Sequence, residues 1–97
     1  MKAYLLVFDR SQVSRDTVTD VIDKIRDIEN WFAFFNNAIC IASEKDARSL
    51  AQQIRTELPK QRFIITEIQA GKKAGWLPKS IWTFLNRPEP VAADTDA

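Results

Sequence analysis

The chain has 97 residues, of which 14 are Lys or Arg, 13 are Asp or Glu and 45% are hydrophobic, as in one globular domain. It contains no His and a single Cys, which excludes a Ser-His triad, a Cys-His pair, an internal disulfide and a Cys/His zinc site. No apolar run approaches the roughly 20 residues of a membrane helix, and we expect no signal peptide. These features predict a small cytoplasmic domain whose chemistry would use carboxylates, hydroxyls and cations.

The net charge of +1 hides an uneven distribution along the chain. Residues 60–87 contain six basic residues against one acid, whereas residues 88–97 contain three acids and no base. A local basic segment can attract phosphate even when the whole chain is nearly neutral. An ordinary solvated surface would explain the same charges, because charged residues also keep proteins soluble.

The first half of the chain predicts a strand, a helix and a hairpin. Residues 3–8 are an uninterrupted apolar run, which is typical of a strand buried on both faces. Ser14 can cap a helix that extends to about residue 30, with apolar residues recurring at helical spacing. Residues 31–35 and 38–42 predict two antiparallel strands joined by a tight turn at Asn36 and Asn37, because Asn tolerates positive φ.

The second half predicts another helix and a fourth strand. Ser43 and Asp46 have the spacing of a capping box, and Pro59 ends the helix that follows. Residues 62–68 are rich in β-formers. The order β-α-β-β-α-β is that of a ferredoxin-like α+β sandwich with an antiparallel sheet, here spanning residues 1–86. Right-handed crossovers would put the first and fourth strands in the sheet centre and both helices on one face.

Helices on one face leave a burial problem, because the first and second predicted strands are apolar on both faces. Either the C-terminal segment or a second subunit must cover the other face. The C-terminal segment predicts a short helix that Pro78 begins, followed by a disordered acidic tail at residues 87–97. For a second subunit, the expected dimer interface consists of Tyr4, Leu6, Phe8, Trp76 and Trp82.

Asp9 is the candidate catalytic and metal-binding residue, because it directly follows the first strand. One carboxylate binds Mg²⁺ poorly, but a two-fold dimer would bring two copies of Asp9 together. The alternative interpretation is that Asp9 ends the strand and accepts hydrogen bonds from loop amides.

Candidate nucleic-acid-binding residues are Arg10 beside Asp9 and, late in the chain, Lys72, Lys73 and Lys79. The three lysines alternate with Trp76 and Trp82, as basic and aromatic residues do in single-strand binding sites. Core packing of the tryptophans and solvation of the lysines would explain the pattern equally.

The strand that ends in Asp9, the element order and the length under 100 residues resemble the Cas-two-like CRISPR-associated proteins. The same Asp, a Trp in the second predicted strand and two late segments resemble the small bacterial proteins labelled SinR-like. The late segments are Ala74-Gly75-Trp76 and Trp82-Thr83-Phe84-Leu85. The resemblance implies a ferredoxin-like homodimer in which the strand-one Asp of each subunit faces its mate and binds a divalent metal. The chain departs from the CRISPR members at Phe34-Phe35-Asn36-Asn37, where those tend to have Arg, Gln and Ser.

We therefore expect a homodimeric, Cas-two-like module that associates with nucleic acid without efficient catalysis. Two alternatives remain open. One is a Mg²⁺-dependent endonuclease that uses paired copies of Asp9, and the other is an antitoxin-like protein-interaction subunit. Fold alone does not choose among these three.

Overall fold

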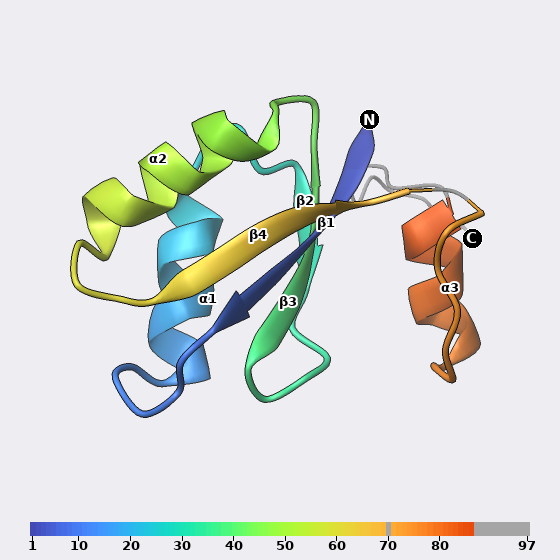
Figure 1. Cartoon of the computed structure of the whole chain (residues 1–97), viewed down its shortest axis with the longest axis horizontal. Helices are drawn as coiled ribbons and strands as arrows, with labels where there is room; N and C mark the ends of the chain where they lie inside the picture. The colour runs from blue at the N-terminus through green and yellow to red at the C-terminus, as the bar shows by residue number, and fades with distance from the viewer. Residues whose placement is uncertain (70, 87–97) are drawn as a thin grey trace.

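The computed structural model describes residues 1–69 and 71–86, which form an α+β fold of four strands and three helices (Figure 1). The elements in chain order are β1 (Lys2–Phe8), α1 (Arg15–Lys24), β2 (Asn30–Phe32), β3 (Ala38–Ser43), α2 (Ala47–Glu57), β4 (Phe63–Ile68) and α3 (Lys79–Asn86). The predicted α+β class, the antiparallel sheet and the short C-terminal helix are confirmed. The expected acidic tail at residues 87–97 lies outside the described residues.

The sheet has the strand order β2-β3-β1-β4, and every neighbouring pair is antiparallel. The prediction that the first and fourth strands are central is therefore wrong, because β1 and β3 occupy the centre and β4 lies at an edge. Each helical crossover skips one strand. The connection from β1 through α1 to β2 passes over β3, and the connection from β3 through α2 to β4 passes over β1. As a result, the described part of the chain gives β4 one hydrogen-bonded neighbour strand, β1.

One face of the sheet packs against both α1 and α2, as predicted (Figure 1). Tyr4, Leu6 and Phe8 point into this core and are almost fully buried, and the Tyr4 hydroxyl donates to the Lys45 carbonyl oxygen at 2.7 Å. Their expected role at a dimer interface is therefore wrong. Alternation along β1 directs these three side chains toward the chain's own helices, so a second subunit cannot reach them.

Helix α3 packs on the opposite face of the sheet, so the C-terminal segment covers part of it (Figure 1). Ile81, Phe84 and Leu85 bury Ala3, Cys40 and Ala42 there, and the ring of Phe84 meets that of Phe32 edge-on at 5.0 Å. Trp82 is half-buried at the margin of this cluster, whereas Trp76 is 97% exposed. Phe34, Phe35 and Ile64 also stay exposed, so the cover is incomplete.

The first helix and the hairpin that follows are shorter than predicted. Helix α1 begins after its predicted cap Ser14 but ends at Lys24, because Ile25 adopts an extended conformation with φ −83° and ψ 112°. Strand β2 ends at Phe32, and residues 33–37 form a longer loop than the expected two-residue turn. No described residue other than glycine has a positive φ, so the turn does not use the left-handed region expected of Asn36 and Asn37.

The second helix also has a different cap from the one predicted. Asp46 is itself the N-cap of α2, since its side chain accepts a hydrogen bond from the Ser49 amide at 2.8 Å. Ser43 instead donates to the Asp27 carbonyl oxygen and accepts from the Lys45 amide. Within residues 1–69 and 71–86, no helix combines the length and the apolar character needed to cross a membrane.

Candidate functional site

Asp9 lies at the end of β1 and closes the first turn of the loop that leads to α1. Its Oδ1 accepts hydrogen bonds from the Ser11 amide at 2.9 Å and the Ser11 hydroxyl at 2.6 Å. These two bonds, with a smaller contribution from the positive charge of Arg62, lower the pKa of Asp9 below its ordinary value of 3.8. The interpretation that Asp9 accepts hydrogen bonds from loop donors is thus confirmed.

Within one copy of the described residues, Asp9 does not belong to a metal-binding cluster of His, Cys, Asp or Glu side chains. That part of the chain contains no cluster of three or more His, Cys, Asp or Glu side chains that could hold a metal ion. The charged neighbour that acts on Asp9 is the cation Arg62. The Mg²⁺ site made by two copies of Asp9 therefore stays a prediction, because it needs a second subunit.

The Asp9→Asn variant is expected to have a lower free energy of unfolding than the parent at neutral pH. Since the pKa of Asp9 is lowered on folding, its stabilising effect is present above the unfolded pKa and is lost as pH falls through the folded value. Urea titrations of both proteins at about pH 7 and about pH 2 should show a difference that disappears in acid. Equal stability at neutral pH would contradict the structural role of the carboxylate.

The four basic residues predicted to bind nucleic acid do not gather at one site. Arg10 lines a small hollow at the start of α1. Lys72 and Lys73 line a different pocket, of about 450 Å³, between the sheet and α3, together with Trp82. Lys79 is the first residue of α3 and lines neither pocket. Only the two adjacent lysines and one tryptophan are brought together.

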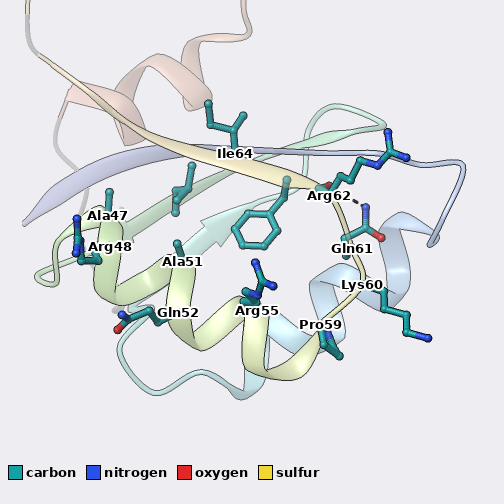
Figure 2. A pocket seen from close by; sticks show the side chains of 12 residues that line it. Ala47, Arg48, Ala51, Gln52, Arg55, Pro59, Lys60, Gln61, Arg62 and Ile64 are labelled. Atoms are coloured by element: carbon teal, nitrogen blue, oxygen red, sulfur yellow. Dashed lines mark hydrogen bonds between the residues drawn. The ribbon is translucent and has the colours of Figure 1, made fainter.

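A larger groove of about 760 Å³ lies between α2 and the edge strand β4, and we call it the α2–β4 groove (Figure 2). It is lined by Ala47, Arg48, Ala51, Gln52, Arg55, Pro59, Lys60, Gln61, Arg62, Phe63, Ile64 and Ile65. Four of these residues are cationic and none is acidic. Glu57 lines an adjoining hollow instead.

The groove follows from the sequence of α2 and from the edge position of β4. The large apolar residues Leu50 and Ile54 are buried in the core and anchor the helix. Ala47 and Ala51, one turn apart, line the side of α2 that faces β4, where their small side chains leave room (Figure 2). Arg55 continues this row, and Figure 2 shows it pointing from α2 toward β4.

The loop that carries Lys60 and Arg62 is held by hydrogen bonds to the neighbouring β1–α1 loop. The Gln61 side-chain amide donates to the carbonyl oxygens of Asp9 at 3.0 Å and of Arg62 at 2.9 Å. The Arg62 amide donates to the Gln12 side-chain oxygen at 2.9 Å. Because both loops are tied together, this end of the groove is ordered before any ligand arrives.

The cations of the groove are available to a ligand. Arg48, Arg55, Lys60 and Arg62 are all exposed. Within the part of the chain that the structure describes, the ion pair found within 4.0 Å joins the Met1 amino group to Glu44, at 3.7 Å, and involves none of them. Sequence reasoning missed Arg48 and Arg55 as site residues. Their spacing of seven, which puts both on one side of a helix, was the available signal.

The arrangement can bind a polyanion, since its basic side chains follow one groove over two turns of α2 and the adjoining loop. The lining contains no carboxylate and no Cys, Ser or His. Comparison of the chain with family models, curated proteins and solved structures finds no match.

Proposed function

We propose that this protein is a nucleic-acid-binding module that acts as a homodimer and lacks efficient catalysis. The observation that carries the proposal is the α2–β4 groove, with three arginines, one lysine and no acid. Arginine pairs well with phosphate, because its planar fork of donors can form two parallel hydrogen bonds to one phosphate group. Arg48 and Arg55 are seven residues apart, or roughly 10 Å along the helix, so they suit a repeated charge better than a single phosphate.

We also infer that the chain has a ferredoxin-like fold of the Cas-two-like kind. The strand order β2-β3-β1-β4 supports it, together with two helical crossovers that each skip one strand. The resemblance of the Asp9 strand end and of the late Gly75-Trp76 segment supports the family. No hydrolytic step is assigned, since the Asp9 carboxylate is bound to Ser11 and lies near Arg62.

The homodimer is supported by the apolar side chains that α3 leaves uncovered. Ile64 is 63% exposed, Phe34 48% and Trp76 97%. A cytoplasmic location belongs to the same proposal and rests on the single cysteine, Cys40, which is a free thiol. Sedimentation equilibrium at tens of micromolar protein tests the dimer, and a monomer there would contradict it.

Binding to nucleic acid is expected to depend steeply on salt. Contacts from four cations predict that the logarithm of the association constant falls with the logarithm of salt concentration with a slope of about −3. Fluorescence anisotropy with labelled oligonucleotides, at several salt concentrations, measures this slope. Absence of binding at micromolar protein in low salt, or binding that does not respond to salt, would overturn the proposed function.

A further inference from the structure

The free edge of β4 presents backbone groups beside the α2–β4 groove. The Asp9 amide donates to the Arg62 carbonyl oxygen at 3.2 Å, which identifies these two residues as a hydrogen-bonded pair of the β1–β4 ladder. Hydrogen-bonded and non-hydrogen-bonded pairs alternate in an antiparallel ladder. The register Val7↔Ile64 is then hydrogen-bonded, whereas Phe8↔Phe63 and Leu6↔Ile65 are not.

Phe63 and Ile65 therefore direct their N–H and C=O groups away from β1. Among residues 1–69 and 71–86, no strand pairs with β4 on that side. Both residues line the groove, so its β4 side offers two donors and two acceptors with the spacing of alternate strand residues. Such a row of unpaired groups can recognise an extended ligand through hydrogen bonds.

The floor of the groove is apolar where its rim is basic. The side chains of Phe63 and Ile65 are half-buried and pack against the α1–α2 core, and Ala47 and Ala51 lie across from them on α2. The Phe63 ring provides a face on which a planar base can stack. A ligand of this groove must therefore match three features at once. These are the cations at the rim, the apolar floor with its aromatic ring, and the free strand edge.

We propose that the α2–β4 groove binds a single-stranded nucleic acid, whose bases lie on the apolar floor and form hydrogen bonds with the free backbone groups of Phe63 and Ile65. Its phosphates contact the four rim cations, Arg48, Arg55, Lys60 and Arg62. A duplex does not fit this arrangement, because its Watson–Crick edges are already paired and cannot reach a strand edge. The inference rests on the proposed function and adds the class of nucleic acid and the way in which it is recognised.

The test compares a labelled oligouridylate of about ten nucleotides with an RNA duplex of the same length, by fluorescence anisotropy. We expect the single strand to bind at least about tenfold more tightly. Equal or tighter binding of the duplex would overturn the inference but leave the proposed function standing. If this protein binds neither the oligouridylate nor the duplex, both the proposed function and the inference are overturned. Saturable binding of a polyglutamate peptide in that case would show that the groove recognises an acidic peptide instead.

The Ile65→Pro variant tests recognition by the strand edge. Proline removes the outward N–H of Ile65 without removing a hydrogen bond to β1, and proline is tolerated on an edge strand in this position. Loss of one hydrogen bond is expected to weaken oligouridylate binding about tenfold. Ile65→Ala controls for lost packing, and Glu67→Pro, outside the groove on the same edge, controls for the proline. Ile65→Ala shows how much binding is lost with the floor side chain alone, and the tenfold effect of the proline is measured relative to it. Glu67→Pro should bind within about twofold of the parent.

If Ile65→Pro binds as tightly as Ile65→Ala, strand-edge recognition is overturned. A measurement on the unaltered protein gives the same decision if the proline variant does not fold. Amide hydrogen exchange of Phe63 and Ile65, followed by NMR, should slow when oligouridylate is added, because their N–H groups then gain acceptors. Exchange that stays unchanged at saturating oligouridylate would also overturn the inference.

Discussion

Replacing Arg55 and Arg62 together by glutamate is expected to lower nucleic-acid affinity by at least about 100-fold, since each charge-assisted contact contributes about 1.5–3 kcal/mol. The two residues lie on opposite sides of the α2–β4 groove, on helix α2 and on the loop before β4. Reversal of both charges removes two contacts and adds repulsion of phosphate. Both side chains are exposed, so the fold should be retained, which circular dichroism can check.

A matched control is the double variant Lys24→Glu with Arg26→Glu. It changes the net charge by the same amount, and Lys24 occupies the last turn of α1 as Arg55 occupies the last turn of α2. Neither Lys24 nor Arg26 lines the groove. Anisotropy titrations at one salt concentration should show near-parental affinity for this control. Equal losses in both double variants would show that overall charge, and not the groove, determines binding.

Phe84→Ala is expected to lower the free energy of unfolding by about 3–5 kcal/mol, because it opens a cavity between α3 and the sheet. Phe84 is 6% exposed and packs edge-on against Phe32. Beneath the same helix lies Cys40, the one cysteine of the chain, which is 2% exposed. Burial also raises the pKa of the Cys40 thiol, so little thiolate is present at neutral pH. The variant should therefore react faster with a thiol reagent such as a disulfide-forming dye.

Leu6→Ala is the control that distinguishes local exposure of Cys40 from a general loss of stability. Leu6 is fully buried on the other face of the sheet, between β1 and the helices α1 and α2, and its loss should cost a comparable 2–5 kcal/mol or so. Under native conditions we expect Cys40 to react faster in Phe84→Ala than in a Leu6→Ala variant of similar stability. If Cys40 reacts at the same rate in both variants, α3 does not protect it. The packing of α3 on this face of the sheet would then be contradicted.

Local patterns in the sequence predicted most of the elements. The apolar run of β1, the stripe of α2 and the stop at Pro59 all act over a few residues, and the corresponding elements are present. The predicted ends of α1 and β2 are wrong, since the apolar residues from Ile25 to Phe35 continue the pattern after the regular structure has ended. Arg15 explains part of the difference, because its guanidinium donates to the carbonyl oxygens of Ala33 and Phe35 and holds that loop against α1.

The candidate site was only partly visible in the sequence. The excess of positive charge after residue 60 pointed to Lys60 and Arg62 but also to Lys72, Lys73 and Lys79, which lie elsewhere. Arg48 and Arg55 belong to a segment with no net excess of positive charge, so counting charge along the chain could not select them. They become part of one site because β4 lies beside α2.

The sequence by itself determined the α+β class, the order of the strands and helices along the chain, and the need to cover a sheet that is apolar on both faces. These properties depend on hydrophobic spacing, caps and helix breakers, which act between residues close in the chain. Tertiary structure alone decided that β4 is an edge strand and that α3 covers part of the second face. It also decided that four cations surround a free strand edge. Each of these depends on pairing between distant segments, where several arrangements satisfy the same local pattern.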